Sequence, residues 1–239
     1  SIDHTLCQTV ENQNSQIFID LSSRNIKNVH LFTSIFIDEF SYTRLKKEVK
    51  ETNPLSFKIG LATTNFLIDR ASFKAEYTRN NIITYKHSIK AIDWSSSSYN
   101  LGHYLKDNSQ EIYLSLKYRI ARGLDMSLSY INAKHGNDYE YLRRDIYGLN
   151  RIRPILQQNF MSDVVWTNQT YAWETNFEIF NNVYAGILLQ YSDISAKEPE
   201  SHQLIGENRY TEQEYLDLYT PKMFQGKSFS LGMNLNIGF

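Results

Sequence analysis

Apolar and polar residues alternate along much of the chain. The clearest example is residues 229–239, FSLGMNLNIGF, in which every odd position is apolar and every even position is serine, glycine or asparagine. An alternation with a period of two is typical of a β-strand with one apolar face. We predict nine such strands, over residues 16–22, 28–40, 54–66, 71–80, 109–120, 124–134, 166–180, 182–193 and 225–239.

The connections between the predicted strands alternate strictly between short and long. The short connections lie at residues 23–28, 67–70, 120–123 and 180–182. The long connections lie at residues 41–53, 80–108, 134–165 and 194–224. A soluble β-sandwich has no reason to sort its loops in this way, whereas an outer-membrane barrel has tight periplasmic turns and long extracellular loops.

Two further features favour a membrane barrel over a soluble sandwich, whose apolar face would meet a second sheet. Within the strands, charged residues occupy the alternate positions that form the polar face. They are Lys74, Glu76, Glu111, Lys117, Arg119, Asp125, Glu174 and Glu178. The apolar face of several strands ends in an aromatic residue. These residues are Tyr77, Tyr118, Tyr130, Trp173, Tyr191 and Phe239. A polar interior and two aromatic girdles characterise transmembrane barrels. We therefore expect the apolar face to meet outer-membrane lipid.

The expected fold is an all-β, antiparallel transmembrane β-barrel in a single domain, residues 1–239. The C-terminal Phe239 resembles the signal of the bacterial outer-membrane assembly machinery, so we expect a periplasmic C-terminus and extracellular long loops. Closed bacterial barrels normally have an even number of strands. Either a strand within 1–14 or 151–165 escapes the pattern, or the chain, with about 9–12 strands, is the carboxyl-terminal portion of a larger barrel. In the second case the strand at 16–22 needs a partner, because lipid does not tolerate a bare strand edge.

One region resembles a known family. Residues 73–88, FKAEYTRNNIITYKHS, and residues 99–119 carry a series of motifs that ends in an acidic residue opening the next strand. The matching residues are Glu76, Tyr77, Thr78, Arg79, Tyr85, His87, Leu101, Gly102, His103 and Glu111. This series resembles the Wzi-like capsule-assembly family of Bacteroidota outer-membrane proteins and its gliding-motility-associated relatives, although the prolines usual in that family are absent. The resemblance implies the carboxyl-terminal half of a larger barrel.

The candidate site residues lie on the predicted inner wall and in the loop 80–108. Residues that are candidates to line a lumen or bind a glycan are Glu76, Arg79, Tyr85, His87, His103, Glu111, Lys117 and Arg119. Loop aromatics suited to stacking on sugar rings are Trp94, Tyr99 and Tyr104. The alternatives are charged residues that pair to brace the wall and aromatics that pack over the barrel mouth.

Several classes of function are disfavoured. The net charge is −1, which argues against a nucleic-acid partner. The single cysteine, Cys7, allows no internal disulfide. His87 and His103 lack a carboxylate or cysteine at ligand spacing, so we expect no metal site. Neither G-x-S-x-G nor H-E-x-x-H occurs, so no enzyme and no cofactor is expected. The loop 194–224 is acidic, and apolar residues at helical spacing predict a short helix over 210–219.

The leading hypothesis is a non-enzymatic outer-membrane β-barrel. By resemblance, its role is the attachment or assembly of surface polysaccharide (capsule), or membership of a larger outer-membrane complex for gliding or secretion. The expected partners are outer-membrane lipid, surface polysaccharide, and other outer-membrane or periplasmic proteins. A porin-like transport channel is the first alternative, and a soluble β-sandwich is the second.

Overall fold

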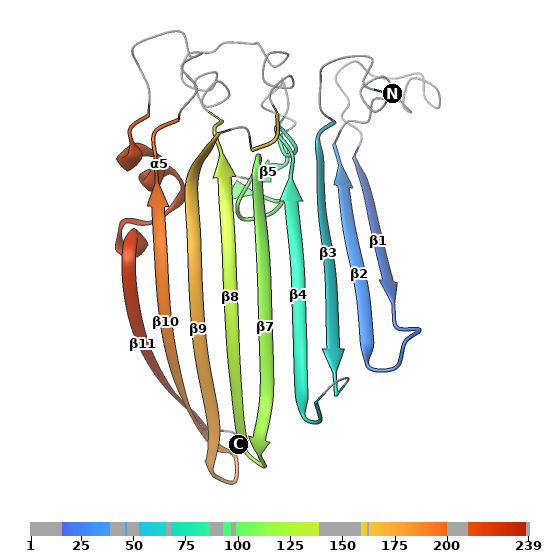
Figure 1. The fold of residues 1–239 in the computed structure, drawn as a ribbon, viewed down its shortest axis with the longest axis vertical. Coiled ribbons are helices and arrows are strands. Elements are labelled where there is room, and N and C mark those ends of the chain that lie inside the picture. The colour runs from blue at the N-terminus through green and yellow to red at the C-terminus, as the bar shows by residue number, and fades with distance from the viewer. Residues whose placement is uncertain are drawn as a thin grey trace.

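The computed structural model describes residues 16–38, 46, 53–65, 68–86, 93–96, 99–138, 159–161, 163–199 and 210–237. Its main body is one antiparallel sheet of nine strands in sequential order (Figure 1). The strands are β1 (Ile17–Ser23), β2 (Val29–Ile37), β3 (Leu55–Thr64), β4 (Ala71–Asn80), β7 (Ser109–Ala121), β8 (Leu124–Gly136), β9 (Val164–Phe180), β10 (Val183–Ala196) and β11 (Gly226–Ile237). All nine predicted strands are present, so the prediction of an antiparallel all-β fold is confirmed.

The smaller elements lie in the long connections. They are the two-stranded ribbon of β5 (Ser95–Ser96) and β6 (Tyr99–Asn100), the helix α5 (Glu212–Tyr219) and the 3₁₀ turn η2 (Lys222–Phe224). The helix predicted over 210–219 is thus confirmed. It begins at a capping box, in which Thr211 and Glu214 bond each other's backbone N–H groups. Among the described residues, no helix is both long enough and apolar enough to cross a membrane.

The short turns gather at one end of the sheet, the lower end in Figure 1. The two tightest turns, Arg122–Gly123 and Asn181–Asn182, have two residues each. Gly123 (φ 77°) and Asn182 (φ 63°) adopt the left-handed conformation there. Glycine and asparagine tolerate this conformation best, and tight hairpins require it. The predicted sorting of short and long connections therefore corresponds to the two ends of one sheet.

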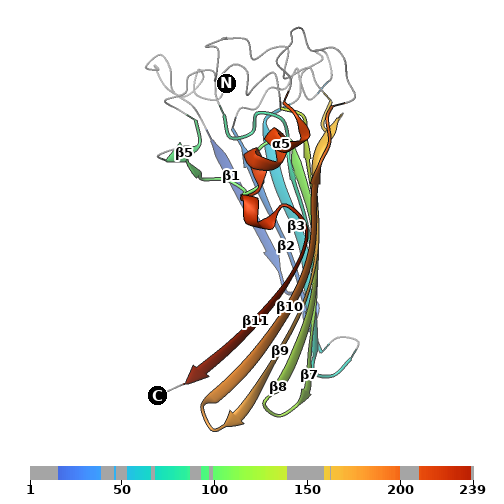
Figure 2. The ribbon, with the colours of Figure 1, turned by 90° about the vertical axis from the view of Figure 1, so that its left-hand side faces the viewer.

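The sheet is curved and open. Figure 2 shows the strands bending to one side, most strongly at β11. In the described part of the chain, β1 and β11 each pair with one neighbour only and not with each other. A closed barrel is therefore not seen. The alternative of a further strand within 1–14 or 151–165 falls outside the described residues, except for 159–161 and 163–165, where the only strand is the start of β9. Cys7, His87 and Phe239 also fall outside the described residues.

The strand register determines which side chains share a face, because directly paired residues point to the same side of a sheet. One row of paired residues crosses the sheet through Leu31, Leu61, Ala75, Leu114, Tyr130, Tyr171, Tyr191 and Phe229. The apolar parities of neighbouring strands therefore fall on one common face. Because α5 packs on the opposite, concave face (Figure 2), the apolar face is the convex one.

The convex face is apolar and exposed. From the row that contains Tyr130 and Tyr171 down to the short turns, no described strand residue on this face is charged. Phe229 and Met233 are 68% and 75% exposed. The charged residues of this face are confined to the long-loop ends of the strands, at Arg79, Lys134, Asp193 and Lys227.

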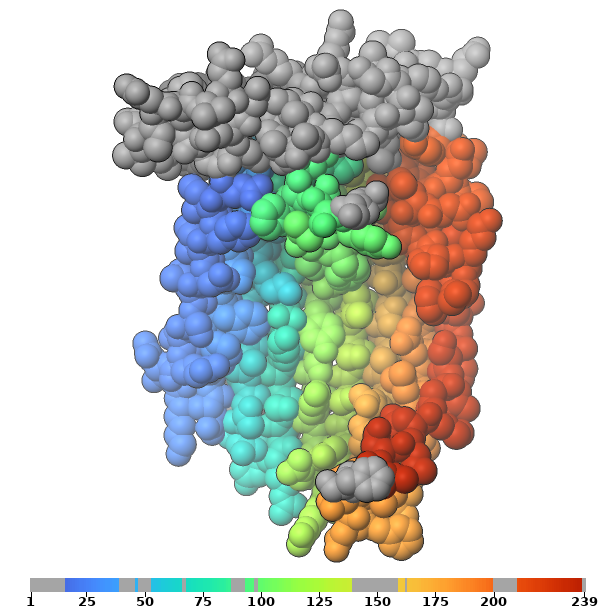
Figure 3. Space-filling view, turned by 180° about the vertical axis from the view of Figure 1, so that it is seen from behind, coloured from blue at the N-terminus to red at the C-terminus, as the bar shows by residue number. Residues whose placement is uncertain are grey.

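Among the described residues, the concave face is covered only near the long-loop end, where Figure 3 shows residues of the 99–108 segment (green) and α5 (orange-red) lying over the strands. The core there consists of Leu105, Ala133, Trp166 and Ile194, with Ile131, Leu216 and Tyr219 packed against it. The Trp166 indole N–H donates to Thr220 Oγ1 at 2.9 Å and ties the helical segment to β9. Below this cover, the concave face is open and polar.

Candidate functional site

The upper part of the open concave face carries a charged cluster that contains several of the predicted site residues. Glu76 on β4 lies 3.1 Å from Lys74 Nζ and 4.0 Å from Lys58 Nζ. On neighbouring β7, Glu111 accepts a hydrogen bond from the Tyr104 hydroxyl, and its Oε1 lies 3.9 Å from His103 Nε2. The structure thus brings Glu76, Glu111, His103 and Tyr104 together.

His103 is neutral at neutral pH in this cluster because it is buried. Desolvation, together with the nearby Lys58 ammonium, lowers the pKa of His103 to about 4, against the opposing effect of the Glu76 charge. A neutral imidazole beside Glu111 is a hydrogen-bonding group rather than a charge partner. The cluster therefore offers a polar ligand two carboxylates, two ammonium groups, a phenol and a neutral imidazole.

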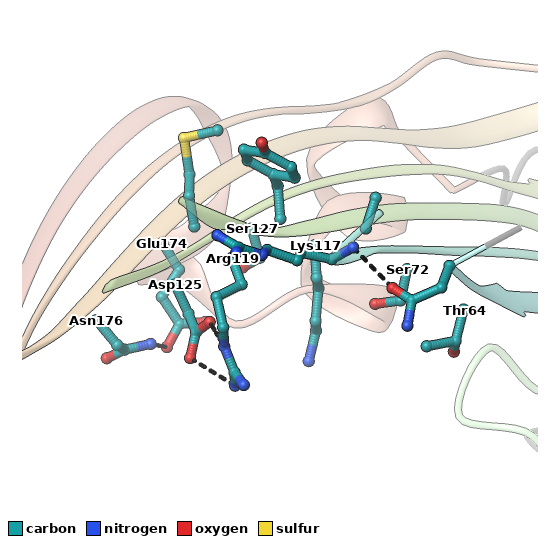
Figure 4. Close-up of a pocket in the computed structure, with 13 residues that line it drawn as sticks. Thr64, Ser72, Lys117, Arg119, Asp125, Ser127, Glu174 and Asn176 are labelled. Atoms are coloured by element: carbon teal, nitrogen blue, oxygen red, sulfur yellow. Dashed lines mark hydrogen bonds and ion pairs between the residues drawn. The ribbon is translucent and has the colours of Figure 1, made fainter. Parts of the chain in front are cut away.

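The lower part of the concave face forms a hollow of about 540 Å³ (Figure 4). Arg119 on β7 pairs with Asp125 on β8, with Nε 2.7 Å from Oδ1. Asn176 Nδ2 donates to Glu174 Oε1 at 2.8 Å on β9. Lys117 lines the same hollow and has no ion pair within the described residues. Arg119 therefore fits the alternative of a bracing pair, whereas Lys117 is available to a ligand.

Tyr85 does not line the concave surface, because it is only 5% exposed. Its hydroxyl lies 2.9 Å from Ser56 Oγ and 2.8 Å from Asn80 Oδ1, and its backbone N–H donates to Asp107. Burial raises the pKa of its hydroxyl. Tyr85 thus anchors the 81–86 segment to the sheet instead of meeting a ligand.

Arg79 also differs from the prediction. Its register partners are Phe57 and Gln110, so it lies on the convex face, not on the inner wall. Its guanidinium lies 3.8 Å from the ring centre of Phe160, and its Nε donates to Asn81. The sequence motif joins Glu76 and Arg79, but a spacing of three residues on a strand places them on opposite faces.

The loop aromatics divide into three environments. Trp94 stands 5.6 Å from Phe18 and 5.8 Å from Phe36 between ring centres, so it packs over the sheet as the alternative foresaw. Tyr104 bonds Glu111 while remaining 62% exposed, and Tyr99 is 78% exposed. Tyr99 and Tyr104 therefore present ring surface to solvent.

A second hollow, of about 480 Å³, lies beneath α5 and was not foreseen. Its floor includes Ile131, Trp166 and Ile194, at concave positions that are polar elsewhere in the sheet. Near the long-loop ends of β8, β9 and β10, the positions that face the concave side change from polar to apolar. This change is visible in the sequence and could have indicated that another segment packs over these strands. In the described ranges, no group of three or more His, Cys, Asp or Glu side chains is suited to holding a metal ion.

Two buried loop carboxyls beside this hollow give a pH prediction. Burial raises the pKa of Asp107 to about 6, and burial together with the charge of Asp107 raises the pKa of Asp138 to about 8. In the unfolded chain both ionise near pH 4. Each carboxyl therefore stabilises the fold fully below about pH 4. This contribution is lost as the pH rises from there to about 6 for Asp107 and about 8 for Asp138, by about 1.4 kcal/mol per pH unit while the carboxyl is protonated only in the folded state.

Thermal unfolding followed between pH 5 and about pH 9 checks this expectation. The midpoint should fall as the pH rises, and Asp138→Asn, which removes the ionisation, should flatten the upper part of the profile. A midpoint that rises over this range, or an Asp138→Asn profile as steep as that of the wild type, would contradict it.

Comparisons with family models, curated proteins and solved structures found no match to this chain.

Proposed function

We propose that the chain is part of the wall of an outer-membrane β-barrel, with no enzymatic activity, that serves the attachment or assembly of surface polysaccharide. The observation that carries the membrane proposal is the convex face. An exposed apolar band that crosses nine strands without a charge exceeds what soluble proteins expose to water. Tyr77, Tyr130, Tyr171 and Tyr191 mark its long-loop border, in keeping with an interfacial girdle.

A larger barrel follows from the open edges. The backbone groups of β1 and β11 that face outward along the sheet need partners in lipid, where each bare group costs several kcal/mol. Both edge strands run from the long-loop end to the short-turn end (Figure 1). Antiparallel closure therefore requires an odd number of additional strands, from residues outside the described ranges, from a longer chain or from a partner protein. A second copy of these nine strands in the same orientation would meet this sheet in parallel pairs.

The polysaccharide role rests on the resemblance to the Wzi-like family and on the concave face. Exposed tyrosines and a charged cluster near the long-loop end suit a hydroxyl-rich ligand. We propose that this end is extracellular and the short turns are periplasmic. By the same resemblance, membership of an outer-membrane complex for gliding or secretion is compatible with the proposed wall.

Labelling of intact cells tests the orientation. With Cys7 replaced by serine, a cysteine at Ser95 should react with a membrane-impermeant maleimide, whereas one at Asn181 in a short turn should react only after the outer membrane is permeabilised. Both positions are exposed, so accessibility in the folded chain is matched. Labelling at Asn181 in intact cells, or none at Ser95, would contradict the proposed topology.

A porin-like channel is the second candidate, because Lys117 faces an open polar hollow without an ion-pair partner in the described residues. Conductance of the complete protein in a planar bilayer distinguishes the two. An open channel gives steady current steps, and a wall that only binds polysaccharide gives none.

A further inference from the structure

The hollow beneath α5 is a built cavity. Its floor comes from β8, β9 and β10, its roof from α5 and η2, and its side from the segment around Leu105. The roof is fixed at two points, by the bond from Trp166 to Thr220 and by the 2.9 Å bond from the Tyr215 hydroxyl to Asn137 Oδ1. Its volume of about 480 Å³ lies in the range of small-molecule sites, roughly 300–1,000 Å³.

Two polar atoms in its wall are buried without a hydrogen-bond partner in the described part of the chain: His135 Nε2 and the Tyr219 hydroxyl oxygen. Such atoms carry a desolvation cost unless a ligand or water satisfies them. The two rings stack with centres 4.0 Å apart, so the two atoms belong to one place in the wall. His135 is 1% exposed, which makes its unmet nitrogen part of the built interior.

The tautomer of His135 determines what its free nitrogen requires. Nδ1 lies 2.7 Å from the Gly136 carbonyl oxygen, which can only accept, so Nδ1 carries the proton. Burial favours the neutral ring. The Leu105 backbone also approaches the imidazole, but Nε2 makes no hydrogen bond of acceptable geometry in the described part of the chain, so Nε2 remains an acceptor. The nearest carboxyl oxygen, of Asp138, is 3.6 Å away, beyond hydrogen-bonding distance. His135 therefore calls for a hydroxyl or N–H donor.

The floor adds a donor and an acceptor. Asn168 Oδ1 accepts from Thr170, which leaves its amide N–H₂ group without a partner among the described residues. Gln190 uses its amide nitrogen on Ser192 at 3.1 Å, which leaves its Oε1 oxygen similarly free. The cavity lining thus offers both donors and acceptors, which suits groups that both donate and accept, as hydroxyls do.

The remaining lining is aromatic and almost uncharged. Trp166, Tyr104 and Phe224 contribute ring surface, and Lys106 is the one formally charged side chain in the lining. Aromatic surface packs against the apolar C–H face of a sugar ring. The described lining carries no carboxylate, and its one cation, Lys106, already faces the Asp107 and Asp138 carboxyls, so an anionic ligand finds no unopposed positive charge there.

We infer that the hollow beneath α5 binds one uncharged, hydroxylated ring, a neutral hexose or its N-acetyl form. A ring hydroxyl donates to His135 Nε2, a second bonds the Tyr219 hydroxyl, and the Asn168 and Gln190 amides hold the opposite edge. The inference rests on the proposed polysaccharide role only for the source of the sugar. A free monosaccharide and the terminal unit of a surface glycan have the same chemistry.

Calorimetric titration of the full protein, in a detergent without a sugar headgroup, tests the inference. The probes are glucose, galactose and N-acetylglucosamine, with glucuronate as the charged comparison, and oligosaccharides that end in the sugar that binds. At least one neutral sugar should bind, and glucuronate should bind at least tenfold more weakly. Tighter binding of the oligosaccharide points to a glycan end, and equal or weaker binding points to the free sugar.

Tyr219→Phe keeps the ring stack on His135 and removes only the hydroxyl, so it should weaken binding about 3- to 10-fold. Tyr113→Phe, the same change on the open concave face outside the hollow, should leave the affinity unchanged. Absence of binding by every neutral sugar, stronger binding of glucuronate, or equal effects of the two variants overturns the inference. Protein that labels at Ser95 but binds no sugar rejects this site and leaves the membrane proposal intact.

Discussion

Leu128→Arg is expected to destabilise the protein by about 2–4 kcal/mol when folding into lipid is measured. Leu128 lies on the convex face at the middle of β8, paired with Leu116 and Trp173, and is 45% exposed. If that exposed surface meets hydrocarbon, a guanidinium there must be desolvated or must deform the bilayer. If it met water, the same substitution would be nearly neutral, because an exposed strand position tolerates arginine.

The control is the adjacent residue. Ser127→Arg places the same side chain on the concave face, in the row that contains Lys117 and Glu174, where the Glu174 carboxylate and water are available. Urea titrations of both variants into vesicles should show a full penalty for Leu128→Arg and less than about 1 kcal/mol for Ser127→Arg. Equal penalties, or the reverse order, would sink the assignment of the convex face to lipid.

Gly102→Ala is expected to cost about 1–3 kcal/mol of stability, the range for overpacking a filled interior. A Cβ atom at Gly102 would lie 2.2 Å from Cε1 of Tyr85. Tyr85 cannot retreat, because its hydroxyl bonds Ser56 and Asn80 and its ring stacks on Phe36. The ring would have to leave its bonds, or the 99–108 segment would have to lift from the sheet.

Gly232→Ala provides the matched comparison. There the nearest atom to a new Cβ is Leu188 Cβ at 3.5 Å, an ordinary contact. Chemical unfolding of the two variants should separate them clearly, with Gly232→Ala close to the wild type. Equal stability of the two would mean that Tyr85 and Gly102 are not in the close contact described. The contact also gives a physical reason for the joint occurrence of Tyr85 and Gly102 in the sequence motif.

The strands could be predicted from the sequence because alternation is a local pattern. Successive residues of a strand point to opposite faces of the sheet, so the residue types alone indicate which face each side chain occupies. The positions of Glu76, Glu111 and Lys117 on the polar face followed from the same rule. The prediction for Arg79 was wrong because it assigned Glu76 and Arg79, which belong to one motif, to the same face of the sheet. Residues three positions apart on a strand lie on opposite faces. Tyr85 was misread because its burial depends on Ser56 and Gly102, neither of which is adjacent in the chain.

The hollow beneath α5 could not be predicted for a related reason. Trp166 and Thr220 are separated by 54 residues, and only the folded sheet brings β9 against the segment that follows the last long connection. A helix could be expected over 210–219 from its spacing, but the spacing does not say which strand the helix covers. The concave-face positions that the helix covers are apolar, and in the sequence they resemble the breaks in alternation that are common at strand ends.

Strand β9 is longer than a membrane-spanning strand needs to be. β9 has 17 residues, whereas about 9–11 tilted residues cross a bilayer. The upper part of β9, from Val164 to the row that contains Tyr171, therefore lies beyond the apolar band. This part of the strand packs against α5 and forms part of the floor of the hollow. Substitutions in these upper strand ends leave the exposed apolar band of the convex face unchanged. If the proposed membrane role holds, the upper ends of the strands and the loops can change what the protein recognises while the apolar band stays the same.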